Sequence, residues 1–181
     1  MIVCPSTAQK YVLIKEGFDA SRIAVVLNGV DEEFFNLSVV PTTTPLNILS
    51  IGKDMGRDYR TLIEAVRGTN TNTVIVASLR NLKGIGDIPE NVKILFDVSQ
   101  KETKEHYRKA HIVVVPEFSE NHWDASDCSG QYVILESMAA GKAVITSERS
   151  TLSDYIQNGK NGLLVKPEDS VALRKALQAC V

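Results

Sequence analysis

A short loop after one apolar run carries two positive side chains. The run of residues 48–51 is followed by GKDMGRD, which places Gly52, Lys53 and Arg57 in one loop. Lysine supplies a compact charge and arginine a planar fork of donors, and the two together suit a pyrophosphate. A solvated basic turn explains the same residues about equally well, because lysine and arginine are common in loops.

A second candidate for anion binding is the start of a helix in SDCSGQYVILESMAAGKAVI, residues 126–145. Ser129 or Gly130 is expected to begin this helix. The first N–H groups of a helix have no partner within it, and the helix dipole places positive charge at the same end. We therefore expect this helix start and the basic loop to converge on one anion.

Glu136 is a single acid within an otherwise apolar and small stretch of the same helix. A carboxylate there either reaches a partner or carries a desolvation cost of a few kcal/mol. The two hydroxyls of a sugar diol could donate to both carboxylate oxygens. The alternative is a glutamate on the exposed stripe of an amphipathic helix.

Several common sites are not supported by the sequence. GIGDIP at 84–89 lacks the third glycine of a dinucleotide fingerprint, and Gly141-Lys142 lacks the other residues of a P-loop. The three histidines, His106, His111 and His122, have neither the spacing nor the acidic neighbours of a zinc site. We expect no metal site.

These candidate residues depend on alternating strands and helices. Strands are predicted at 23–26, 48–51, 73–77, 92–96, 112–115, 143–146 and 162–165, with the first outside the main sheet. Helices are predicted at 57–67, 101–110, 131–140, 152–157 and 171–179, the last capped by Ser170. The pattern indicates an α/β fold, an open parallel sheet covered by helices on both faces.

Three predicted strands end in polar loops that would lie at the same edge of this sheet. The loops are GKDMGRD after residue 51, PEFSENHWDASDCSG after residue 115 and SERSTLSD after residue 146. An open α/β sheet binds ligands in the crevice outside the carboxyl ends of its strands. The basic loop, the helix start and Glu136 are therefore expected to share one site.

Composition restricts the function further. The 181 residues include 20 Lys and Arg and 22 Asp and Glu, a net charge of −2, so no nucleic-acid partner is expected. Cys4, Cys128 and Cys180 show no pairing pattern, which suits a reducing, cytoplasmic location. We expect no signal peptide or transmembrane segment, and the sequence leaves peripheral membrane attachment open.

Five segments in order resemble the C-terminal half of the retaining nucleotide-sugar glycosyltransferases of GT-B architecture, group 1 or family 4. They are VVLNGVDEEFF, SIGKDMGRDYRTLIEAV, AHIVVVPE, VILESMAAGKAVITS and DYIQNGKNGLLVKPED. The resemblance covers nearly the whole chain. It implies a remnant of the N-terminal half and inter-domain linker at 1–35, a Thr/Pro linker at 36–47 and a Rossmann-like nucleotide-sugar-binding domain at 48–181.

The resemblance also implies roles for single residues. Lys53 and Arg57 would contact the diphosphate of a UDP-sugar or GDP-sugar, and Glu136 the ribose hydroxyls. The backbone N–H groups of Gly130, Gln131 and Tyr132 would contact phosphate or sugar. The enzyme would move a hexose to a glycan or lipid-linked acceptor without a cofactor.

The sequence departs from the family at several positions. Cys128 stands where the family usually has a glutamate that contacts the donor sugar, and a thiol cannot replace that carboxylate. Asp127 or Asp124 could substitute in a shifted loop, and Asp154 stands where the family often has a glutamate.

The second departure is length, because family enzymes bind the acceptor with an N-terminal half of similar size. We expect this chain alone to bind a donor without transferring sugar. The alternative is a non-catalytic nucleotide-sugar-binding or interaction module. Another sugar-nucleotide enzyme, such as an epimerase, fits less well.

Overall fold

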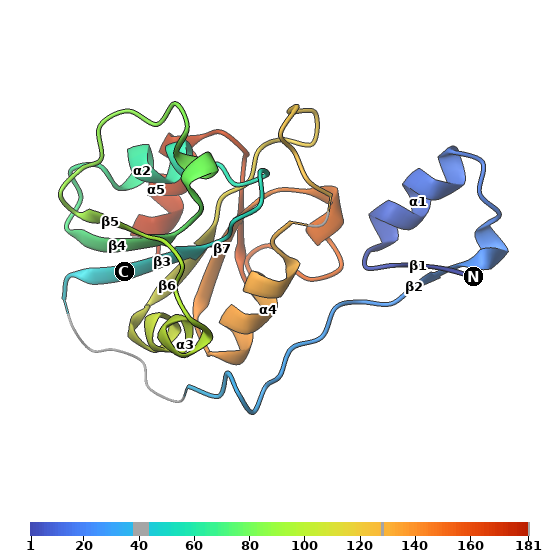
Figure 1. The fold of residues 1–181 in the computed structure, drawn as a ribbon, viewed down its shortest axis with the longest axis horizontal. Coiled ribbons are helices and arrows are strands. Elements are labelled where there is room, and N and C mark those ends of the chain that lie inside the picture. Colours follow the sequence, from blue (N-terminus) through green and yellow to red (C-terminus); the bar gives the residue numbers. More distant parts are fainter. Residues whose placement is uncertain (38–43, 128, 181) are drawn as a thin grey trace.

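The fold comes from a computed structural model that describes residues 1–37, 44–127 and 129–180 (Figure 1). Part of the predicted linker, residues 38–43, and Cys128 lie outside the described residues. Within the described ranges, no helix has the length and apolar character needed to cross a membrane.

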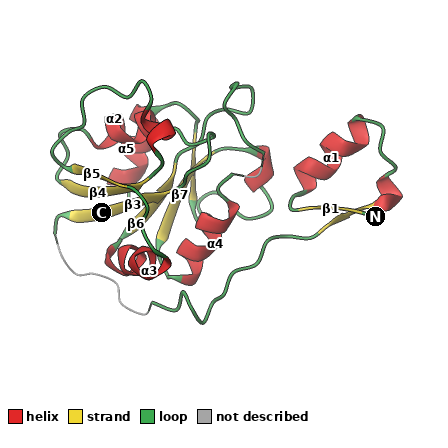
Figure 2. Cartoon of the chain, in the orientation of Figure 1, coloured by secondary structure: helices red, strands yellow, loops and turns green. Residues whose placement is uncertain are grey.

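The main sheet is parallel throughout, and its six strands lie in the order β5-β4-β3-β6-β7-β8 (Figure 2). The strands are β3 (Leu46–Ile51), β4 (Thr71–Val76), β5 (Val92–Leu95), β6 (Ile112–Val115), β7 (Ala143–Ser147) and β8 (Leu163–Val165). The chain builds outward from β3 to β5, then returns to β6 and builds in the opposite direction. The topological switch point therefore lies between β3 and β6.

Helices cover both faces of this sheet, and the alternation of strand side chains divides the core in two. The helices are α2 (Tyr59–Val66), α3 (Gln100–Lys109), α4 (Gln131–Ala139) and α5 (Ser170–Gln178). Ile48 packs in a core with side chains of α2 and α5, and the next residue, Leu49, packs in a core with side chains of α3 and α4. The α/β fold expected from the sequence is confirmed.

The first 25 residues form a second, two-stranded parallel sheet with its own short helix. β1 (Ile2–Cys4) pairs with β2 (Ile23–Val25), and α1 (Thr7–Lys15) and a 3₁₀ turn, Ala20–Arg22, connect them. The predicted strand at 23–26 therefore lies outside the main sheet, as expected. The side chain of Tyr155 bridges the two parts, because it donates to Pro5 O at 2.7 Å and accepts from Asn28 N–H at 3.0 Å.

Two local predictions are wrong. The predicted helix at 152–157 is a 3₁₀ turn at Ser150–Leu152 followed by a turn, and its N–H groups bond locally within that turn. The last helix is capped by Asp169, whose side chain accepts from Ala172 N–H, and Ser170 is the first helical residue. A carboxylate at the N-cap has the further advantage of favourable charge at the positive end of the helix.

Candidate functional site

The loops that follow β3 and β6 are joined by backbone hydrogen bonds at the switch point. Asp58 N–H donates to Pro116 O and Phe118 N–H donates to Gly56 O, each at 3.0 Å. These two bonds flank an isolated antiparallel bridge between Arg57 and Glu117. The basic loop is therefore fixed to the start of the long loop that leads to α4.

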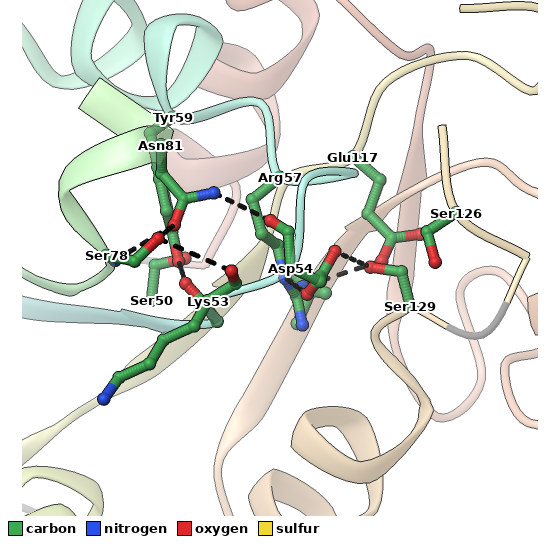
Figure 3. A network of polar contacts seen from close by, with 12 residues as sticks. Ser50, Lys53, Asp54, Arg57, Tyr59, Ser78, Asn81, Glu117, Ser126 and Ser129 are labelled. Atoms are coloured by element: carbon green, nitrogen blue, oxygen red, sulfur yellow. Dashed lines mark hydrogen bonds and ion pairs between the residues drawn. The ribbon is translucent and has the colours of Figure 1, made fainter. Parts of the chain in front are cut away.

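Arg57 lies inside this junction, with 3% of its side chain exposed. Its Nε donates to Asp54 Oδ2 at 2.9 Å, and its Nη1 lies 3.6 Å from Glu117 Oε1 (Figure 3). Burial acts to lower the pKa of Arg57, but the negative charges of Glu117 and Asp54 outweigh it and raise this pKa above its ordinary value. The arginine that the sequence assigns to a diphosphate is already held between two acids of the protein.

Glu117 is the buried acid of this junction that sequence reasoning missed. Its side chain is 0% exposed, and its N–H donates to Ser147 Oγ at 2.9 Å, at the end of β7. Burial raises the pKa of the Glu117 carboxyl, and the charge of Arg57 opposes that rise. The available signal in the sequence was an acid directly after the apolar strand and Pro116. This position was predicted only to begin a loop.

Two glycines make room for this buried pair. A Cβ added to Gly52 would lie 2.2 Å from Arg57 Nε, and one added to Gly130 would lie 2.7 Å from Glu117 Oε1. Gly130 also has φ of +86°, a conformation that favours glycine. The glycines at both predicted anion-binding elements are therefore required by the packing of Arg57 and Glu117.

The start of α4 is joined to the basic loop through Asp54. Gly130 is the N-cap of α4 and offers no side chain to the first N–H groups. Ser129 Oγ donates to Asp54 Oδ1 at 2.7 Å, and Asp54 also accepts from Arg57 (Figure 3). Gln131 is buried and Tyr132 is exposed. The structure thus brings the helix start and Arg57 into one polar network.

Lys53 stands apart from that network although it belongs to the same loop. Half of its side chain is exposed, and Nζ lies 3.6 Å from Asp97 Oδ1. In Figure 3 its ammonium extends away from Arg57 and Asp54. Its carbonyl accepts from Arg80 Nη2 at 2.7 Å, which fixes the backbone while the side chain stays accessible.

Glu136 lies about 9 Å further along α4 than Gly130, at 1.5 Å of rise per residue. It is half-buried, and its Oε2 accepts from the phenol of Tyr107, on α3, at 2.8 Å. Burial raises the pKa of the Glu136 carboxyl, and the Tyr107 hydrogen bond lowers it by a smaller amount. Glu136 is therefore not on a fully exposed stripe, and its partner is a neutral hydroxyl.

The three aspartates predicted as sugar contacts are separated in the structure. Asp124 lines a pocket of about 400 Å³ together with Arg57, Phe118 and Trp123. Asp127 Oδ1 lies 3.7 Å from Arg149 Nη2.

Asp154 faces the N-terminal unit. Its carboxylate accepts from the N–H and the hydroxyl of Thr7, at 2.6 and 2.9 Å, at the start of α1. This acid contacts the first turn of that helix in the structure.

Among the described residues, neither a metal-binding cluster nor the larger cavity contributes to the candidate site. No group of three or more His, Cys, Asp or Glu among the residues described is arranged to hold a metal ion. A larger cavity, of about 760 Å³, is lined by Pro45, Thr71, Arg174 and Leu177, at the opposite edge of the sheet from the switch point. It contains none of the predicted site residues.

Comparison with known proteins identifies the family. The family model of group 1 glycosyl transferases matches residues 56–181. The amylovoran biosynthesis glycosyltransferase AmsK of Erwinia amylovora is 28% identical over 181 positions, which cover 93% of this chain and 44% of AmsK. The chain thus spans less than half the length of this curated relative.

Solved structures share the fold at low sequence identity. HepE of Anabaena, in complex with UDP-glucose, matches 99% of this chain and 53% of its own, with a TM-score of 0.77 and 17% identity. The C-terminal domain of LpcC from Francisella tularensis matches 83% of this chain and 87% of its own, with a TM-score of 0.60 and 20% identity. The chain therefore belongs to the group 1 glycosyl transferases, and its fold is that of the C-terminal half of a GT-B enzyme.

Proposed function

We propose that this chain is the donor-binding half of a retaining glycosyltransferase that moves a hexose from a UDP-sugar or GDP-sugar to a glycan or lipid-linked acceptor. One observation carries the proposal. The loops after β3 and β6, which contain Lys53, Arg57 and the start of α4, meet at the topological switch point of the sheet. Ligands of open α/β sheets bind at this position.

The charge at this point suits a leaving nucleoside diphosphate. Gly130 offers no side-chain cap to the start of α4, and the positive end of the helix dipole there favours an anion. The exposed ammonium of Lys53 adds a mobile positive charge. In the intact enzyme these groups and Arg57 would stabilise the negative charge that develops as the sugar departs, and the scheme requires no metal or other cofactor.

Glu136 is assigned to the ribose hydroxyls. The phenol of Tyr107 occupies Oε2 and holds the side chain in place, so that Oε1 is the oxygen to which a diol would donate. The acceptor and closure of the active site would come from an N-terminal half, and the intact enzyme would be cytoplasmic or peripheral to the membrane. The chain alone is proposed to bind the donor without transfer.

Calorimetry with UDP-glucose and GDP-mannose tests this assignment. Glu136→Ala should weaken binding about tenfold or more, since it removes the acceptor of two hydrogen bonds. Lys53→Ala should weaken it by a few-fold at low salt, because the side chain is exposed. Lys109→Ala is the matched control, since this exposed lysine ends α3 at the opposite edge of the sheet. Equal weak affinity in all four proteins would refute the site.

A second candidate function is a nucleotide-sugar-binding module without catalysis, and Cys128 at the usual glutamate position favours it. The two candidates differ when a compatible N-terminal half is attached. Sugar transfer by the joined protein supports the glycosyltransferase, whereas donor binding without transfer supports the module.

A further inference from the structure

The guanidinium of Arg57 is shared by two acids of the protein. Asp54 accepts from Nε at 2.9 Å, while the Glu117 carboxylate lies 3.6 Å from Nη1. With both acids ionised, one positive charge faces two negative charges, and the Arg57 and Glu117 side chains are buried. A diphosphate that approached Arg57 would therefore compete with two carboxylates for its guanidinium, which the basic loop in the sequence does not reveal.

The contact between Arg57 and Glu117 is an ion pair without a hydrogen bond. Arg57 Nη1 and both oxygens of Glu117 are buried and have no hydrogen-bond partner in the described structure. A buried, unpaired polar atom is costly, so the arrangement is poorly satisfied on both sides. Nη1 is thus a hydrogen-bond donor that a ligand could engage. Glu117 is the acid that lies beside it in the structure.

The charged groups around Glu117 come from two of the loops packed against it. Asp54 and Arg57 lie on the loop after β3 and Arg149 on the loop after β7, whereas the start of α4 contributes the neutral hydroxyl of Ser129. Arg149 is engaged by the carbonyls of Phe118 and Ser126 and lies near Asp127. Arg57 is the nearest cation to Glu117, so a change at Arg57 acts most strongly on this carboxylate.

We propose that Glu117 is the internal counter-ion of Arg57, and that a donor diphosphate takes over Arg57 and drives a proton from solvent onto the Glu117 carboxylate. This inference rests on the proposed function, since it concerns the same diphosphate. The reaction is a proton transfer alone: the Glu117 oxygen gains an O–H bond, and the proton comes from water or buffer.

The direction of the coupling follows from the environment of Glu117. Its pKa is already raised by burial, and the positive charge of Arg57 is the largest of the effects that restrain that rise. A bound diphosphate would neutralise that charge and raise the pKa further. Glu117 then has one pKa in the donor-free protein and a higher pKa in the donor-bound protein. At pH values between these two, donor binding takes up a proton, and the affinity for the donor increases as the pH falls.

Calorimetry of UDP-glucose binding measures this proton directly. UDP-glucose is the suitable probe, because its diphosphate has no group that titrates near neutral pH. The titration is repeated between pH 5 and 8 in buffers with different enthalpies of ionisation. We expect proton uptake to reach a maximum near one proton per donor, with a dissociation constant that falls up to about tenfold per pH unit there. If UDP-glucose binds but proton uptake is absent at every pH between 5 and 8, the inference is overturned.

Glu117→Gln provides the second readout, because glutamine has the same shape and imitates the protonated acid. The variant should bind UDP-glucose about tenfold more tightly than the unmodified protein at the high-pH end, and without proton uptake. Glu64→Gln is the control: Glu64 also pairs with an arginine, Arg67, at 3.0 Å, but this pair is exposed at the far end of α2. It should leave proton uptake and affinity unchanged.

The possible failures are distinguishable. If neither UDP-glucose nor GDP-mannose binds at any pH, the proposed function fails and this inference fails with it. If the donor binds but Glu117→Gln weakens it or keeps the proton uptake, only the role of Glu117 is refuted. The measurement on the unmodified protein stands even if the variant does not fold.

Discussion

Glu117 and Glu136 are two acids of the candidate site with opposite surroundings. Glu117 is fully buried and faces a guanidinium, whereas Glu136 is half-buried and accepts from a neutral phenol. Burial raises the pKa of both, and only at Glu117 does a full positive charge oppose it. The difference teaches that Glu117 is a buried charge whose partner matters for stability, while Glu136 is a half-buried acid held by a neutral hydrogen bond.

The largest expected effect comes from removing the partner of Glu117. Arg57→Met should lower the free energy of unfolding by about 3–5 kcal/mol, because it leaves a buried acid without its counter-ion. Arg67→Met breaks the exposed pair with Glu64 and should cost under about 1 kcal/mol. Urea unfolding measures both. If the two variants lost similar amounts of unfolding free energy, burial would not explain the contribution of the Arg57–Glu117 pair to stability.

The glycine beside Glu117 offers a second test. Gly130→Ala should cost about 1–3 kcal/mol, since its φ is positive and the new Cβ would meet Glu117 Oε1. Gly159→Ala is a matched control, because Gly159 also has a positive φ, +74°, but a Cβ there meets nothing within 4 Å. A smaller loss is therefore expected for Gly159→Ala in thermal unfolding. Equal losses would indicate that φ alone accounts for both.

The dependence of stability on pH tests the direction of the pKa shift at both acids. Because their folded-state pKa values are raised, their favourable contribution is complete below the unfolded-state pKa and is lost as the pH rises through the folded-state pKa. Glu117→Gln and Glu136→Gln should gain stability relative to the unmodified protein as the pH rises, by at most about 1.4 kcal/mol per pH unit. Unfolding from pH 4 to 8 should show this gain for each variant, and a loss of stability relative to the unmodified protein as the pH rises would contradict the raised pKa of that acid.

The smallest effect on stability is expected at Lys53, the exposed cation of the same loop. Lys53→Ala should change the free energy of unfolding by no more than about 0.5 kcal/mol, because exposed ion pairs contribute little. Any loss of donor affinity should disappear as salt is added. A large loss of stability would mean that Lys53 is part of the buried network after all.

The sequence predicted the six main strands, from their apolar runs, and the four helices that cover them, from the segments between those runs. It missed β1 and α1. β1 has only three residues, and α1 has no fully buried residue among those that form it, so neither has an apolar pattern to detect. The segment 152–157 was mistaken for a helix because its buried apolar residues, Leu152, Tyr155 and Ile156, have helical spacing.

The site was predicted in part. Sequence reasoning placed Arg57 and the start of α4 at one edge, and the structure joins them through Asp54. The inward direction of the Arg57 side chain could not be predicted, because the spacing of the charged residues in GKDMGRD does not indicate which cation is buried. Glu117 was missed for a related reason: burial of a residue in a loop depends on the contacts of three separate strand ends.

Two-dimensional NMR of the isotope-labelled chain titrated with UDP-glucose tests the central claim most directly. The account predicts that the amide shifts concentrate at residues 52–58 and 129–136, on both sides of the switch point. Shifts confined to the cavity at the opposite edge, around Thr71 and Leu177, or no shifts at all with UDP-glucose and GDP-mannose, would contradict it.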